Sequence, residues 1–217
     1  MRHSLGVILL LVVGSVQANV IHSQAVDESI NGLYSWVRSP TSQRVTDNFI
    51  LSDSYTIESL SWYGGYVASG VETDAHEFRI SIYEDAGGAP GTTLIEQQFI
   101  STTGSLTGLS NNASGALYEY SAALNPFVLT SGGNYWIEIV ENDLLTSGAW
   151  AIAESAPTSQ GVHYRSSDAD SWSNGAQGTR GELAFTVSGT VVPIPAAVWL
   201  FGSGLGLLGW FRRRRIV

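Results

Sequence analysis

Apolar and polar residues alternate in short runs through the middle of the chain, and Gly, Asn, Ser or Pro separates one run from the next. In the clearest run, Glu77–Tyr83, the three large apolar residues share one face and the polar residues between them share the other. Alternation with a period of two residues predicts a half-buried β-strand. The side chains that we expect to be buried in this run and in later ones are Phe78, Ile80, Ile82, Ile137, Ile139 and Phe185.

The same pattern recurs about every ten residues. The stretch Glu84–Gly91 is rich in turn-forming residues and leads into the predicted strand Leu94–Ile100, which indicates a hairpin. The weaker stretch Asn19–Thr46 is interpreted as a lead-in or an edge strand. Further predicted strands are Asn48–Leu51, Tyr55–Tyr63, Ala116–Ser121, Phe127–Thr130, Asn134–Glu141, Ala149–Ala153, Gly161–Arg165 and Leu183–Ser188.

One predicted strand contains an irregularity. In Tyr55–Tyr63, Ile57 lies on one parity whereas Leu60 and Trp62 lie on the other, which predicts a β-bulge near residues 58 and 59. About ten short strands without helices long enough for crossovers indicate an all-β fold. We expect an antiparallel two-sheet sandwich of the jelly-roll kind.

The C-terminal segment has a different pattern. From Val191 to Phe211 there is no charged residue, and the apolar run 196–211 is followed by four arginines. A helix of this length spans ~30 Å, the thickness of a bilayer core, and basic residues stay on the cytoplasmic side. We therefore predict a transmembrane helix whose cytoplasmic stop is formed by Arg212, Arg213, Arg214 and Arg215.

A short proline motif precedes this predicted helix. Proline fixes its own φ and favours an extended conformation in the residue before it, so the motif is predicted to be strand-like and readable by a protease. The alternative is a permanent membrane anchor without processing. The motif residues are Val192, Pro193, Ile194, Pro195 and Ala196.

The order of motif, apolar span and arginines resembles the PEP-CTERM class of bacterial sorting signals, and is most similar to its VPLPA-type variant. The departure is Ile194, where that variant has Leu and the namesake class has Glu. The resemblance covers residues 192–217 and implies recognition by an exosortase, a membrane-embedded, transpeptidase-like protease of Gram-negative bacteria that make exopolysaccharide. The resemblance also implies that the protein is anchored transiently in the inner membrane and then reaches the cell surface or the extracellular space.

The N-terminus indicates export by the Sec pathway. Residues 1–18 have a basic start, an apolar stretch from Leu5 to Val13 and a small residue, Ala18, at the predicted cleavage site. An uncleaved anchor is the alternative. The predicted organisation is thus a signal peptide (1–18), one exported domain (19–190) and a sorting segment (191–217).

Charge and composition exclude several function classes for the exported domain. All 19 acidic residues but only five basic ones lie in residues 19–190, which gives a formal charge of −14. This charge repels nucleic acid and anionic lipid, and it favours either solubility or the binding of divalent cations. Cysteine is absent, so thiol catalysis and cysteine metal sites are excluded.

Candidate chemistry is sparse. His22, His76 and His163 show no metal-ligand spacing, and no nucleophile elbow or phosphate-binding loop occurs. Asp168 and Asp170 are candidate calcium ligands, because alternate carboxylates in a loop suit Ca²⁺; the alternative is that they are solvated loop carboxylates.

Aromatic residues are the other candidates for binding. Trp62 and Trp136 lie in strand patterns and are predicted to be core residues, whereas Trp172 lies in a polar loop and is the candidate glycan platform. The strand pattern is also similar to a β-rich module of exported bacterial proteins that carries no known catalytic residues. We expect a non-catalytic surface or matrix protein associated with exopolysaccharide. The alternative is an extracellular glycosidase or esterase with an unrecognised site.

Overall fold

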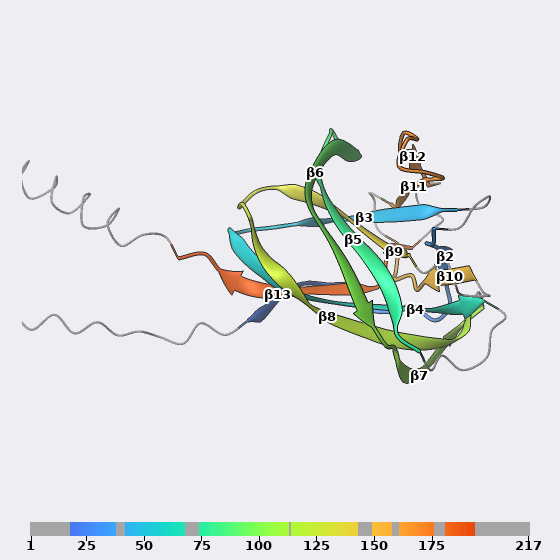
Figure 1. Ribbon diagram of the computed structural model, residues 1–217. Coiled ribbons are helices and arrows are strands. Elements are labelled where there is room, and N and C mark those ends of the chain that lie inside the picture. Colours follow the sequence, from blue (N-terminus) through green and yellow to red (C-terminus); the bar gives the residue numbers. More distant parts are fainter. Residues whose placement is uncertain are drawn as a thin grey trace, which may run out of the picture.

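The computed structural model describes residues 18–37, 42–67, 74–112, 114–142, 149–157, 161–175 and 181–193. In these ranges the chain contains strands but no helix, and the strands form two antiparallel sheets (Figure 1). The expected all-β fold is therefore confirmed. Within the described ranges, no helix is long and apolar enough to cross a membrane.

Each sheet combines strands from distant parts of the sequence. Sheet A contains β1 (Asn19–Ser23), β2 (Leu33–Tyr34), β4 (Tyr55–Val67), β7 (Ser105–Asn111), β8 (Gly115–Leu129), β10 (Ala149–Ile152) and β13 (Phe185–Val191). Sheet B contains β3 (Arg44–Ile50), β5 (His76–Asp85), β6 (Pro90–Thr102), β9 (Asn134–Glu141), β11 (His163–Arg165) and β12 (Ser173–Asn174). The order in sheet B is β12-β11-β3-β9-β5-β6.

Strand β4 organises sheet A. One edge of β4 pairs with β8, and β7 extends the sheet beyond β8. The other edge pairs first with β13 and then with β10, and these two strands carry β1 and β2 at their outer sides. Among the described strands, β4 therefore has three partners in sheet A, β8, β13 and β10.

The two sheets face each other across one hydrophobic core, as in a β-sandwich. Both sheets contribute large apolar side chains to it, including the fully buried Trp62 and Trp150 of sheet A and Phe78 of sheet B. The rings of Phe78 and Trp62 meet edge to face, with centroids 5.1 Å apart. All six side chains that alternation predicted to be buried are buried.

The predicted bulge in β4 is also present. The register against β8 shifts between Ile57 and Ser59, so that Ile57, Leu60 and Trp62 all point into the core despite their parity. Because each parity change would otherwise move an apolar side chain to the solvent face, the bulge keeps the whole strand amphipathic.

Other boundaries differ from the expectation. The two strands predicted at Ala116–Ser121 and Phe127–Thr130 form the single strand β8, because the residues around Pro126 lie in the register shift opposite the β4 bulge. Strand β7 was not predicted, since its Ser, Thr and Gly content reads as a loop. The stretch expected to be a lead-in or edge strand contains β1, at the edge of sheet A.

Candidate functional site

The sequence-predicted site residues Asp168, Asp170 and Trp172 lie in the segment between β11 and β12. This segment, residues 166–172, packs over the outer face of sheet B. The outer face is the one that carries Arg79 of β5, because its neighbours Phe78 and Ile80 point into the core. We call the segment the covering loop.

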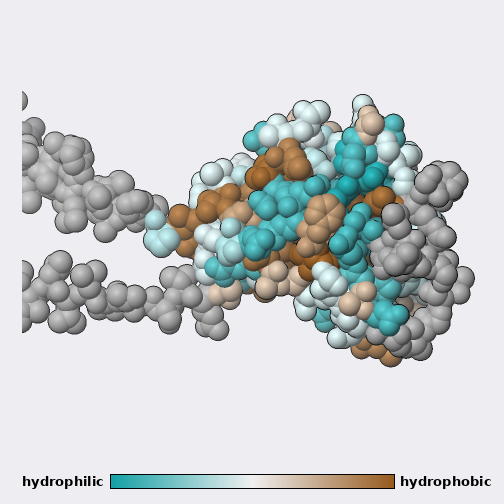
Figure 2. Space-filling view, viewed as in Figure 1, coloured by the Kyte–Doolittle hydropathy of each residue, from teal (hydrophilic) through white to brown (hydrophobic). Residues whose placement is uncertain are grey.

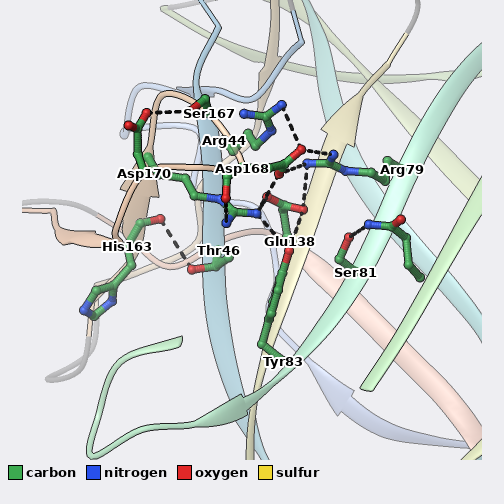
Figure 3. Close-up of polar contacts among 12 residues, drawn as sticks. Arg44, Thr46, Arg79, Ser81, Tyr83, Glu138, His163, Ser167, Asp168 and Asp170 are labelled. Carbon is green, nitrogen blue, oxygen red and sulfur yellow. Dashed lines mark hydrogen bonds and ion pairs between the residues drawn. The ribbon is translucent and has the colours of Figure 1, made fainter. Parts of the chain in front are cut away.

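Three arginines from three strands converge on Asp168 (Figure 3). Arg79 donates from both terminal nitrogens, Nη1 to Oδ2 at 2.8 Å and Nη2 to Oδ1 at 3.1 Å. Arg165 donates from Nη2 to Oδ1 at 2.8 Å, and Nη2 of Arg44 lies 3.3 Å from Oδ2. Although burial alone would raise the pKa of Asp168, hydrogen bonds and charge from Arg79 and the other arginines hold it below its ordinary value.

A second carboxylate lies beneath the arginines. Glu138 of β9 is fully buried and accepts from Arg79 Nη2 at 3.1 Å and from Arg165 Nη2 at 3.2 Å. The hydroxyl of Tyr83 lies 3.3 Å from Glu138 Oε2, and burial together with this carboxylate raises the pKa of Tyr83. Two carboxylates and three guanidinium groups therefore form one network, in which each guanidinium group contacts at least one carboxylate.

Strand register explains why these residues meet. Arg79 lies opposite Val140 of β9, and Arg44 of β3 lies opposite Arg165 of β11. Because β9 lies between β3 and β5, side chains of the same parity on all four strands share the outer face. The arginines are far apart in sequence, so only the register identifies the cluster.

Trp172 packs onto this network. Its ring is half-buried, the guanidinium carbon of Arg165 lies 4.2 Å from the ring centroid, and the ring of Tyr83 meets it edge to face at 5.8 Å. A cation over an aromatic face is attracted by the ring quadrupole. Trp172 is therefore a fixed ring whose unburied part faces solvent, rather than a free platform.

The two candidate calcium ligands have different partners. Both oxygens of Asp168 face arginines, whereas Oδ2 of Asp170 accepts from the hydroxyl of Ser167 at 2.8 Å. Among the residues that the structure describes, no group of three or more His, Asp or Glu is arranged to hold a metal ion. Calcium binding stays a prediction.

A buried carboxyl pair lies between the sheets and was not identified from the sequence. Asp47 and Glu182 are 0% and 1% exposed, and their side chains are hydrogen-bonded to each other. Burial raises the pKa of Asp47 well above its ordinary value, and Glu182 raises it further, although backbone N–H groups of Leu183 and Asn48 oppose this. The sequence signal was present, because Asp47 has the same parity as the core residues Val45 and Phe49.

The histidines lie on three strands and each packs against an aromatic ring. The centroid distances are 5.2 Å from His22 to Phe185, 4.8 Å from His76 to Tyr66 and 4.7 Å from His163 to Trp136. Burial lowers the pKa of His22 and of His163.

The described part of the proline motif lies just beyond the sandwich. Strand β13 ends at Val191, the N–H of Val192 donates to the carbonyl of Ser54 at 2.9 Å, and Pro193 is exposed. Ala18, the predicted cleavage residue, is exposed directly before β1. The predictions for Ile194, Pro195, Ala196, the span 196–211, the arginine stop and residues 1–17 lie outside the described residues.

No family model matches the chain, and no curated protein is significantly similar to it.

Proposed function

We propose that this protein is an exported, non-catalytic surface or matrix protein that an exosortase sorts through the segment from Val192 to Arg215. The observation that carries the proposal is the order of motif, apolar span and arginines in the sequence. In this proposal the chain leaves by the Sec pathway, is anchored briefly in the inner membrane and then reaches the cell surface or the extracellular space.

The fold supports access to the motif. Strand β13 ends at Val191, and Val192 keeps one backbone hydrogen bond to Ser54, so the motif leaves the sheet at the exposed Pro193. A protease binds its substrate in an extended form, which the two prolines of the motif favour. Cleavage there would leave every described strand intact.

We further propose that the exported domain is a jelly roll. In that fold the chain behaves as one long hairpin rolled up, so that the first strand pairs with the last and inner strands pair in nested order. The pairs β1 with β13, β3 with β9, β4 with β8 and β5 with β6 are nested in this way. The pairs β13 with β4 and β9 with β5 complete the two sheets.

The role we propose for the domain is contact with exopolysaccharide. Trp172 supports it, because a partly exposed ring held by Arg165 and Tyr83 offers a sugar a rigid apolar surface at small entropic cost. Beside the ring, the side chain of Asp168 is 55% exposed and within reach of sugar hydroxyls.

Intact mass of protein recovered outside the cell tests the sorting step. We expect the mature chain to lack residues 1–18 and 212–215. A variant with Pro193→Ala and Pro195→Ala should keep the arginines and stay with the membrane fraction, whereas Pro90→Ala, a change outside the motif, should be processed normally. Extracellular protein that still carries Arg212–Arg215 would exclude sorting.

Binding of the processed protein to exopolysaccharide tests the second step. Trp172→Ala should weaken binding about fivefold or more, since stacked aromatic contacts contribute ~1 kcal/mol or more each. Trp36→Ala is the control, because Trp36 lies outside the covering loop. Equal binding by both variants and the parent protein would remove Trp172 from the contact.

A further inference from the structure

Both ends of the exported domain lie at one end of the sandwich. Asn19, the first residue of β1, pairs with Gly189 of β13, and both chain ends leave the sandwich on the same side (Figure 1). The loops that follow β3 and β8 lie there too. Ser54 joins them to the C-terminal exit, since its carbonyl accepts from Val192 N–H and its hydroxyl accepts from Ser131 N–H at 3.0 Å.

We call this surface the terminal face and define it by residues 18–20, 50–55, 128–133 and 191–193. In these ranges Asp53 is the sole charged residue, although the exported domain is rich in acidic residues. Four of its apolar side chains are exposed: Val20 (65%), Ile50 (58%), Val128 (54%) and Val191 (46%). Figure 2 shows hydrophobic surface directly beside the point where the C-terminal segment leaves.

Exposed acidic residues lie in both halves of the sandwich: Glu84 lies beside the start of β9, close to the terminal face, and several others lie at the opposite end. Asp74 and Glu77 lie at the start of β5, and Glu28 accepts from the N–H of Ser110 on β7. Asp168 and Asp170 lie on the covering loop, near the start of β3. The terminal face itself carries only Asp53, so an anionic bilayer repels this face less than it repels a surface with several carboxylates.

The tether is short. The described chain ends at Pro193, and the predicted membrane span begins at Ala196, so two residues lie between them. An extended chain covers at most ~3.6 Å per residue, which keeps Pro193 within about 11 Å of the span. The headgroup region adds only about 5–8 Å on each side of the hydrocarbon core. The terminal face is therefore held at the level of the headgroups.

We propose that the terminal face contacts the lipid headgroups of the bilayer that holds the C-terminal segment, with the opposite end of the sandwich directed away. This inference rests on the proposed function, because it requires the span to be inserted. The contact depends on the tether, which supplies a high effective concentration for a weak apolar surface. It is consistent with the expectation that the free acidic domain does not bind anionic membranes.

The absence of native cysteine allows a direct experiment with the full chain. Single variants Ser131→Cys, on the terminal face, and Ser105→Cys, at the start of β7, are each labelled with a fluorophore. Both serines are exposed. The labelled chains are inserted into phosphatidylcholine vesicles that contain a lipid with a quencher on its headgroup. We expect quenching at Ser131 to be at least threefold stronger than at Ser105, and equal quenching would overturn the inference.

Flotation and alkaline extraction of the same vesicles separate this outcome from failure of the proposed function. A chain that does not stay with the vesicles has no inserted span, which contradicts the sorting proposal itself. A chain that stays but shows equal quenching contradicts only the membrane contact. A change in the fluorescence of the Ser131 label that appears only when the exosortase is added, and equally with and without the quencher lipid, would assign the terminal face to the enzyme. It would overturn the lipid contact.

Charge variants provide a second readout. In vesicles that also contain anionic lipid, Val128→Asp should reduce quenching at Ser131 at least twofold, because it places a negative charge on the terminal face. Leu106→Asp is the matched control, since Leu106 is 64% exposed on β7 at the opposite end of the sandwich. It should leave quenching at Ser131 unchanged, and equal effects of the two variants would contradict the proposed orientation.

Discussion

Buried apolar side chains on the facing sides of the two sheets determine much of the stability of this domain. Ile80 is 3% exposed in the centre of β5, whereas Ile50, at the end of β3, is 58% exposed. Ile80→Ala should lower the free energy of unfolding by about 2–5 kcal/mol, because it removes buried methylenes and leaves a cavity. Ile50→Ala should change it by less than ~0.5 kcal/mol. Urea unfolding of both variants measures the difference, and similar losses would mean that the sheet facing is wrong.

The buried pair of Asp47 and Glu182 should make stability depend on pH. Since burial and Glu182 raise the folded-state pKa of Asp47 above its unfolded value of about 3.9, the folded state binds the shared proton more tightly. The resulting stabilisation is complete below the unfolded pKa and is lost as the pH rises through the folded pKa. Each pKa unit of elevation corresponds to ~1.4 kcal/mol of this loss.

Glu182→Gln tests that pH dependence. The amide keeps an acceptor for the N–H of Gly161 and supplies a permanent donor to Asp47 in place of the shared proton. The free energy of unfolding should then fall less steeply with rising pH. The difference between the variant and the parent protein should therefore shift in favour of the variant toward pH 8. Denaturant unfolding between pH 4 and pH 8 measures both slopes. Glu58→Gln serves as control because Glu58 is only partly buried, and parallel slopes for Glu182→Gln and the parent would contradict the shared proton.

Among the elements, the covering loop is attached to sheet B mainly through one side chain, that of Asp168. Asp168→Asn removes one of the two carboxylate charges that the arginines share. Asp170→Asn removes the same charge from the loop, but the Asp170 carboxylate accepts from Ser167 rather than from an arginine. Because the Asp168 side chain is 55% exposed, we expect a global loss of no more than about 1 kcal/mol. Local opening should be affected more, so hydrogen exchange in residues 163–175 should become faster for Asp168→Asn and stay unchanged for Asp170→Asn. Equal exchange would show that the arginines do not hold the loop.

The strands show which parts of this fold can be predicted from the sequence and which cannot. Alternation identified the strands of the core and the bulge in β4, because burial on one face imposes a period of two residues. It failed for β7, whose small polar residues at a sheet edge need not alternate. The arginine cluster required the pairing of β3, β9, β5 and β11, which is a long-range property that no local pattern contains. Asp47 was visible as a polar residue at a core position and could have been found.

At the scale of the whole molecule, the nested strand pairs determine both folding and the placement of the ends. The first and last strands, β1 and β13, pair only after nearly all of the domain has been synthesised. Contacts so distant in sequence require costly loop closure, so we expect folding on the slow side for a domain of this size. The same pairing brings the predicted signal-peptide cleavage site and the proline motif to one end, where processing leaves the strands undisturbed.

A circular permutant tests this topology. Joining Val191 to Asn19 through a short glycine linker should be tolerated, because Asn19 pairs directly with Gly189. New ends between Gly87 and Gly88 would lie in an exposed turn where both glycines have positive φ, at 77° and 90°. This permutant should keep a β-type far-ultraviolet spectrum and melt within several degrees of the parent domain. Opening the chain between Trp62 and Tyr63 instead interrupts β4, which pairs with β8, β13 and β10, and should abolish cooperative melting. If the two permutants behaved alike, the central place of β4 and the adjacency of the ends would both be wrong.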